Sequence, residues 1–355
     1  MKKLIALIAA LVLVAGYANA AEWNFYGSAR VNTLFTDSET VAVGGIGTVD
    51  VTQFAMALQG NSRIGANVKV SDELSGRFEF SSGVATRLLY GTWNFGAGAL
   101  VIGQAYTPLQ MLQSNQMWNG DNDLVGQGGV YAGRAAQLKL VFGDFQVAAI
   151  APSANITAVT DIAFVSSENT MPRIEASYGF KMNNFKAKVA GGYNTQEVTT
   201  ATSVLDVDSW VAAINASANF GALSIAGAAY TGVNSNQIMA ANPGGLLAGN
   251  GALNGVGGVT GTAILDDDCM GFSIIGGYKV SDMLGLEIGY GKAEVERDTV
   301  IASDEVTVYY AQAVITLAPG VFIVPEFGVI DNEEIGIAGT VNEINYFTAK
   351  WQINF

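Results

Sequence analysis

The side chains that most often do chemistry in proteins are scarce in this chain of 355 residues. It contains no histidine, so the commonest general base and metal ligand is missing, together with Ser-His and Cys-His catalytic pairs. Cys269 is the only cysteine, which excludes an intramolecular disulfide framework. We therefore predict that the protein is not an enzyme, has no catalytic residue and needs no cofactor.

One run of acidic residues invites a chemical interpretation. Asp266, Asp267 and Asp268 end the segment 231–268, which is rich in glycine, asparagine and alanine and is otherwise nearly uncharged. Adjacent carboxylates can bind a divalent cation, but the simpler interpretation is the solvated end of a mobile loop. We predict no metal site.

Residues 1–20 have the pattern of a cleaved signal peptide. Lys2 and Lys3 precede the apolar run Leu4–Val14, and Ala18-Asn19-Ala20 is a small-residue cleavage site. The alternative is an uncleaved anchor helix. Cleavage after Ala20 leaves residues 21–355, which we predict to be one exported domain because they show no linker or composition shift. The short, lysine-rich signal peptide indicates a bacterial protein.

The charge of the mature chain limits its partners. Removing Lys2 and Lys3 from the 17 basic residues leaves 15 against 31 acidic ones, a formal net charge of −16. This balance argues against nucleic acid and against anionic membrane surfaces.

The last ten residues alternate completely between apolar and polar side chains. Phe347, Ala349, Trp351, Ile353 and Phe355 share one face of an extended strand, and Tyr346, Thr348, Lys350, Gln352 and Asn354 share the other. Similar segments of about ten residues, the length a tilted strand needs to cross a bilayer, recur through the chain. The mature chain has no apolar run of transmembrane-helix length. We therefore assign the apolar faces to lipid, the alternative being the last strand of a soluble β-sandwich.

Sixteen such strands are predicted, with fourteen or eighteen as alternatives. They cover 24–36, 54–70, 77–80, 87–95, 99–104, 136–142, 145–151, 173–181, 185–193, 210–220, 223–230, 270–280, 284–291, 305–317, 321–329 and 346–355. Long and short connections alternate, which is typical of an all-β, antiparallel, up-and-down transmembrane β-barrel. An even number lets the last strand pair with the first and leaves no open edge. Between Ala105 and Gly133 the alternation is lost, and Trp118 with several Leu and Met predicts an ordered third loop.

Four stretches resemble the general trimeric porins of Gram-negative outer membranes. They are Ser62-Arg63-Ile64-Gly65 with Val70–Leu74, Val101–Pro108, Ala318-Pro319-Gly320 with Val324–Gly328, and the final strand ending in Phe355. The resemblance covers the whole mature chain, and the order of the motifs carries it. It implies an outer-membrane homotrimer that contacts lipid and lipopolysaccharide, and in which the third loop folds inward and narrows each barrel.

The resemblance also implies a charged constriction. Its basic ladder would be Arg30, Arg63, Arg77, Arg87 and Arg134, opposed by Asp121 and Asp123 on the third loop. Alternatively, these are lumen charges paired with neighbours such as Glu79, or rim charges in solvent. The third loop lacks the family's Pro-Glu-Phe-Gly stretch, and the second external loop, Ser81–Thr86, is too short for the latch between subunits.

The function predicted from these features is passive diffusion of small hydrophilic solutes and ions through a water-filled lumen. The excess of acidic residues predicts a mild cation preference, which inward arginines could cancel or reverse. Two alternatives remain. One is a substrate-specific channel, for sugars for example, with Tyr26, Tyr90 and Tyr309 as an aromatic track. The other is a non-conducting barrel with a structural or adhesive role.

Overall fold

A computed structural model describes residues 21–41, 48–152, 157–158, 164–239, 255–297, 303–333 and 341–355. The predicted signal peptide, 1–20, lies outside the described residues. Within the described part of the chain, no helix is long and apolar enough to cross a membrane.

Strands make up almost all of the regular structure. They are β1 (Glu22–Val41), β2 (Thr48–Leu58), β3 (Arg63–Lys69), β4 (Leu74–Ser81), β5 (Thr86–Asn94), β6 (Ala99–Tyr106), β7 (Arg134–Phe142), β8 (Phe145–Ile150), β9 (Thr157–Ala158), β10 (Phe164–Glu168), β11 (Arg173–Met182), β12 (Phe185–Thr200), β13 (Val204–Phe220), β14 (Leu223–Val233), β15 (Gly258–Val259), β16 (Ile264–Leu265), β17 (Asp267–Lys279), β18 (Leu284–Arg297), β19 (Ser303–Ala318), β20 (Val321–Glu333) and β21 (Val341–Asn354). Among the residues that the structure describes, the helices are α2 (Trp118–Asp121) and the 3₁₀ helix η1 (Ser235–Gln237), and both lie in connections between strands.

Eighteen of these strands form one antiparallel sheet, and β9, β15 and β16 form a small separate one. The start of β1 pairs with β3 and its end pairs with β2, so β2 and β3 are two halves of one wall strand interrupted at 59–62. In the same way, β10 and β11 both pair with β12. Counting each split strand once gives the sixteen strands that the alternation predicts.

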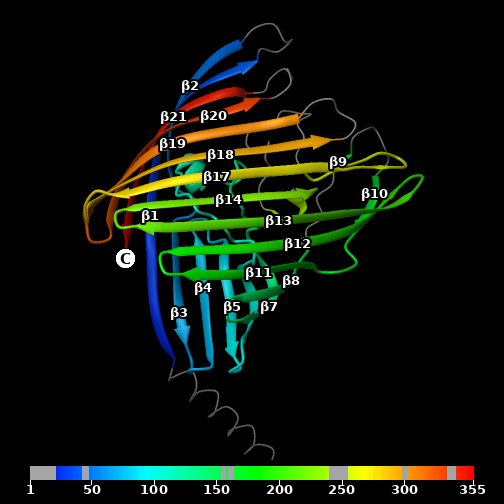
Figure 1. Cartoon of the computed structure of the whole chain (residues 1–355), viewed down its shortest axis with the longest axis horizontal. Coiled ribbons are helices and arrows are strands. Elements are labelled where there is room, and N and C mark those ends of the chain that lie inside the picture. The colour runs from blue at the N-terminus through cyan, green and yellow to red at the C-terminus, as the bar shows by residue number, and fades with distance from the viewer. Residues whose placement is uncertain are drawn as a thin grey trace, which may run out of the picture.

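The sheet closes on itself. β21 pairs with β1 from Ser28↔Asn354 to Thr40↔Val341, and this contact joins the two ends of the strand order. Figure 1 shows β11–β14 and β17–β19 side by side as one wall of the molecule, with β3, β4, β5 and β7 crossing at a steep angle. Closure pairs the backbone groups that an open edge would expose, which a hydrocarbon environment requires. The predicted closed, antiparallel, all-β barrel is confirmed.

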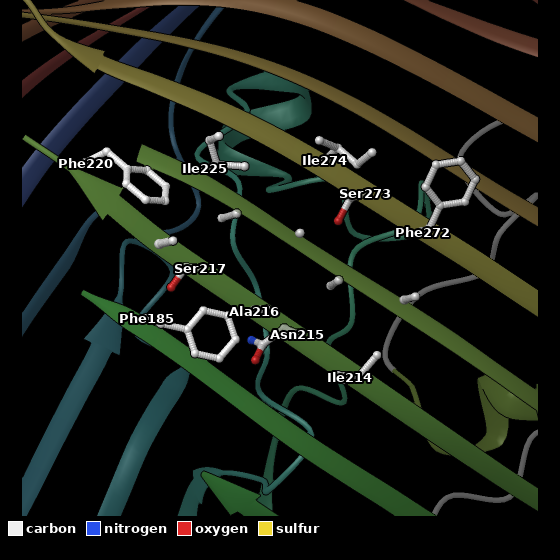
Figure 2. Close-up of a pocket in the computed structure, with 15 residues that line it drawn as sticks. Phe185, Ile214, Asn215, Ala216, Ser217, Phe220, Ile225, Phe272, Ser273 and Ile274 are labelled. Atoms are coloured by element: carbon white, nitrogen blue, oxygen red, sulfur yellow. The ribbon is translucent and has the colours of Figure 1, made fainter. Parts of the chain in front are cut away.

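The two faces of the wall differ as the alternation predicts. In β21, Phe347, Trp351 and Ile353 are exposed, whereas Tyr346 and Thr348 on the other face are buried. Figure 2 shows the same apolar character on β12, β13, β14 and β17. There, Phe185, Ile214, Phe220, Ile225, Phe272 and Ile274 line a shallow apolar groove. An apolar outer face and a polar inner face are what a barrel in a bilayer needs.

Several strands run further than the sequence predicts. Residues 194–207 were expected to be a loop, but β12 continues to Thr200, β13 starts at Val204, and only a tight turn joins them. Beyond Tyr193, polar Thr195 and Glu197 take the alternate positions that apolar residues hold lower in the strand. The alternation therefore disappears from the sequence although the strand pairing continues.

Candidate functional site

The third loop, 107–133, contacts the polar face of strands far apart around the wall. The Leu109 N–H donates to Glu175 on β11 at 3.0 Å, the Asn115 N–H to Glu287 on β18 at 2.9 Å, and the Met117 N–H to Glu326 on β20 at 2.8 Å. A segment of this length cannot reach these strands around the outside of a closed wall. We infer that the loop crosses the interior, and Figure 2 shows its teal trace passing behind the strands of the wall.

A buried carboxylate of the wall holds the tip of the loop. Glu326 accepts hydrogen bonds from the backbone N–H groups of Met117 and Trp118 and from the Tyr346 hydroxyl, at 2.8, 3.2 and 2.9 Å. The Trp118 ring lies 4.8 Å from the Tyr346 ring, between centroids. The carboxylate satisfies N–H groups at the start of α2 that have no partner within the helix. The first turn of α2 is thereby attached to β20 and β21.

The last residue of α2 joins the loop to both ends of the sheet. Asp121 accepts from Arg30 Nη1 at 2.6 Å and Asn61 Nδ2 at 2.8 Å through one oxygen, and from Lys350 Nζ at 2.9 Å through the other. Burial alone would raise the pKa of Asp121, but Lys350, the Asn61 hydrogen bond and Arg30 together lower it. Asp121 is therefore ionised at neutral pH, and its charge is matched by two cations.

Asp123 behaves differently although it lies two residues away. Burial, and then the neighbouring charge of Asp121, raise the pKa of Asp123 to about 8. Its backbone and that of Leu124 both have positive φ, 57° and 60°, which L-residues seldom adopt. The Gln116 side-chain oxygen accepts from the Leu124 N–H at 3.0 Å and holds this conformation. A pKa of about 8 leaves the Asp123 carboxyl mostly neutral at pH 7.

A cavity of about 570 Å³ lies beside the loop, between it and the wall. Its charged lining consists of Arg30, Arg63, Arg87, Arg134, Lys350, Asp121 and Asp123. Tyr106 and Tyr131 also line it, and the Arg134 guanidinium lies 5.3 Å from the centre of the Tyr106 ring. The structure thus brings together six of the seven residues predicted for the constriction. Their role at a constriction stays a prediction.

Arg77, the seventh, lies elsewhere. It lines a separate cavity of about 380 Å³ with Tyr90 and Asn67, beside the short turn between β3 and β4. Its Nε donates to the Tyr26 hydroxyl at 2.9 Å. Positions on successive strands predict the face of a side chain but not its height along the barrel, because the strands are tilted and shifted against one another.

Three of the predicted arginines share one buried carboxylate. Glu79 lies 2.6 Å from Arg87, 3.4 Å from Arg77 and 3.6 Å from Arg63, and it accepts from the Tyr26 hydroxyl. The alternative pairing with Glu79 is therefore present in the structure. The register between β4 and β5 shifts at Arg87, which leaves it as an extra residue between Thr86 and Leu88. Such a bulge redirects a side chain, here toward Glu79 and the cavity.

Sequence reasoning missed Lys350 as a site residue. The alternation of the last strand predicts that Lys350 lies on the polar face, and this is the only feature of the sequence that points to a place in the site. Its contact with Asp121 depends on the closure of the barrel, which sets Lys350 opposite Asn32 and Gln352 opposite Arg30.

The three tyrosines predicted as an aromatic track do not lie together. Tyr309 is half exposed and points outward with the apolar side chains of β19, whereas the Tyr26 hydroxyl is hydrogen-bonded to Glu79 and Arg77. A continuous track of Tyr26, Tyr90 and Tyr309 is not formed.

The acidic run is divided, because Asp266 and Asp268 are exposed and Asp267 is not. Asp267 is fully buried, and Arg297 holds it through two hydrogen bonds, from Nε at 2.6 Å and Nη2 at 2.9 Å. The prediction of a solvated end is therefore wrong for Asp267, because its partner lies thirty residues further on in β18. Within the described ranges, no group of three or more histidine, cysteine or acidic side chains is placed to hold a metal ion.

The fold is similar to that of several solved outer-membrane proteins, although the sequence matches are weak. No protein-family model and no reviewed protein sequence matches the chain. Among solved structures, the outer membrane channel DcaP of Acinetobacter baumannii superposes with a TM-score of 0.72 at 17% identity, over 95% of this chain and 98% of the other. OmpT of Vibrio cholerae gives 0.62 at 17%, over 95% and 98%. An anion-selective porin from Comamonas acidovorans gives 0.57 at 12%, over 94% and 100%. The chain therefore has the fold of Gram-negative outer-membrane porins.

Proposed function

We propose that this chain, with the fold of the outer-membrane porins, forms a water-filled channel in a bacterial outer membrane for passive diffusion of small hydrophilic solutes and ions. The observation that carries the proposal is the charged cavity between the third loop and the inner wall of a closed sixteen-stranded barrel. A polar, charged wall keeps water in the lumen, while the loop limits the size of solutes.

The charges around the cavity decide which ions it favours. Five basic side chains line it against two acidic ones, and the pKa of Asp123 keeps that residue largely neutral at pH 7. The cation preference predicted from the total charge of the chain stays untested. Because selectivity follows the narrowest section, we propose that the local excess of positive charge makes the channel favour anions.

The oligomeric state belongs to the same proposal. OmpT of Vibrio cholerae, which shares the fold, has been solved in a trimer form. We propose a homotrimer, with the apolar outer faces against lipid, lipopolysaccharide and neighbouring subunits. Chemical cross-linking of the purified protein in detergent tests it, and a species of three chains is expected.

A second candidate rests on a different observation. Two clusters of buried apolar residues lie on the inner side of the wall, one around Leu109 and Ile238 and one around Trp118 and Leu124. They cover the inner side of β13, β14 and β17–β21, and a non-conducting structural barrel would need such packing across the whole interior. Current through a planar bilayer separates the two functions, since the channel gives discrete conductance steps and a filled barrel gives none.

A further inference from the structure

A second connection besides the third loop lies against the inner wall. After β14 the chain continues as 234–239, around η1, and all six residues are buried. The composition of this region predicted a mobile loop, and residues 240–254 lie outside the described residues. The described residues Asn234–Met239 are called the inner segment below.

The start of the inner segment is fixed to the wall by paired polar groups. The Asn234 N–H donates to the Asp267 carbonyl at 2.8 Å, and its side-chain oxygen accepts from the Asp267 N–H at 2.9 Å. Its amide nitrogen donates to the Asp208 carbonyl on β13 at 2.9 Å. The Asp267 carboxylate is held by Arg297 and accepts from the Gly257 N–H at 3.1 Å. Burial of a charged pair is tolerated when further hydrogen bonds satisfy it, as they do here.

The end of the inner segment lies three strands away, against the third loop. Arg173 on β11 donates through Nη1 to the Ile238 carbonyl at 3.1 Å. Ile238 and Leu109 meet over Gly192 on β12, where an added Cβ would lie 3.0 Å from a methyl carbon of each. The inner segment and the third loop therefore form one packed layer on the inner wall.

The apolar cluster that joins the inner segment to the third loop lies on one side of the lumen. It uses inward residues of four wall strands, namely Val211 and Ala213 on β13, Ala228 and Tyr230 on β14, Cys269 on β17 and Val295 on β18. The charged cavity instead takes its basic wall residues from β1, β3, β5, β7 and β21. The two sets share no strand, so the interior is divided into a packed side and a wet side.

We propose that the inner segment is a second constriction element, which together with the third loop closes the β12–β17 side of the lumen and confines solutes to the arginine-lined side. The proposal rests on the proposed channel function. The residues that determine it are Asp267 and Arg297, which fix one end, and Ile238 and Met239, which pack the other. Displacing the inner segment would add a second water path beside the first.

Cys269 reports the position of the inner segment independently of conduction. Its side chain points inward from β17 and is 3% exposed. The Cys269 side chain belongs to the same buried cluster as Ile238 and Met239 of the inner segment, and its Sγ also lies 3.4 Å from the Asp267 carbonyl oxygen. A bulky hydrophilic maleimide should not reach this thiol while the inner segment is in place. It should react once the segment moves into the lumen.

The experiment compares two variants that release different ends of the inner segment. The double variant Asp267→Asn/Arg297→Met removes the buried pair without leaving a lone charge, and Ile238→Ser/Met239→Ser removes the apolar contacts. Lys292→Met is the matched control, since Lys292 is on the same strand as Arg297 and pairs at 2.7 Å with Glu305, but on the opposite face. Each protein is measured for maleimide labelling of Cys269 and for single-channel conductance.

We expect Cys269 to be protected from the maleimide in the wild type and in the control. In a variant that releases the inner segment, we expect rapid labelling together with a conductance increase of roughly twofold, because the water-filled cross-section grows. A labelled variant with wild-type conductance would overturn the proposal. Rapid labelling of the wild type, or full protection in both folded variants, would overturn it too. Absence of any wild-type conductance instead contradicts the channel function, while the labelling still reports the packing.

Discussion

Lys350 on the last strand donates to Asp121 on the third loop at 2.9 Å, and Arg30 on the first strand donates to the other oxygen of the same carboxylate at 2.6 Å. The two cations lie on neighbouring strands, β21 and β1, across the seam where the barrel closes. One loop carboxylate therefore bridges the seam from inside. The position of the third loop and the charge of the cavity depend on the same three side chains.

Removing the charge of Asp121 should make the channel more anion-favouring. Asp121→Asn leaves Arg30 and Lys350 without a carboxylate beside the cavity. A unit charge about 4 Å from an ion in water changes its energy by about 1 kcal/mol, or roughly fivefold in permeability ratio. The reversal potential in a KCl gradient measures the change. Asp72→Asn is the control, because Asp72 lies in an exposed turn, and equal shifts in both variants would contradict the assignment.

Among the arginines, Arg134 should matter more than Arg77. Both carry one positive charge on the polar face, but only Arg134 lines the cavity beside the third loop. Arg134→Gln should shift the reversal potential toward cations, by roughly the same fivefold factor in permeability ratio. Arg77→Gln should shift it by less than half as much. Equal effects would show that the two cavities contribute alike to selectivity.

Selectivity should depend on pH through Asp123. The pKa of its carboxyl is about 8, so the group is mostly neutral at pH 7 and mostly ionised at pH 9, which adds a negative charge beside Asp121, Lys350 and Arg30. Anion preference should therefore weaken as the pH rises from 7 to 9. Asp123→Asn should remove most of this change, and a pH profile identical to that of the wild type would argue against the assignment.

The third loop packs so closely against the wall that a larger side chain at the contact should disturb it. An alanine at Gly291 on β18 would place its Cβ against the Gln127 carbonyl oxygen and within 3.3 Å of Leu124. Gly291→Ala should destabilise the folded barrel by about 1–3 kcal/mol, as overpacking does, and change its conductance. Gly285→Ala, on the same strand with open space around it, should do neither. Unfolding in denaturant and single-channel recording measure both effects.

The wall of the barrel was predictable because its signal is local. Each strand separates an apolar environment from a polar one, so alternation within ten residues, as in 346–355, identifies both the strand and its faces. Because the signal is local, the parts of strands that lack the alternation were not predicted. At the outer ends of β12 and β13 both faces are polar or mixed, and the strands continue without a pattern that would show it.

The sequence predicted which residue types face the site better than it predicted their contacts. Arg30, Arg63, Arg87 and Arg134 reached one cavity because each holds an inward position, whereas Arg77 differs from them in height along the barrel. Lys350, the Asp267–Arg297 pair and the inner segment depend on contacts between residues far apart in sequence. Of the residues with positive φ in the third loop, Asn119, Asp121 and Asp123 are of types that adopt this region comparatively often, whereas Leu124 is not, and its residue type gives no signal for it.

The proposed channel requires a water-filled path past the basic side chains beside the third loop. Single-channel conductance and reversal potential of the purified protein in a planar bilayer, under a salt gradient, test it most directly. Discrete conductance steps, in groups of three for a trimer, with a reversal potential on the anion side are the expected result. A bilayer that stays closed, or a reversal potential on the cation side at pH 7, would contradict the channel or its selectivity respectively.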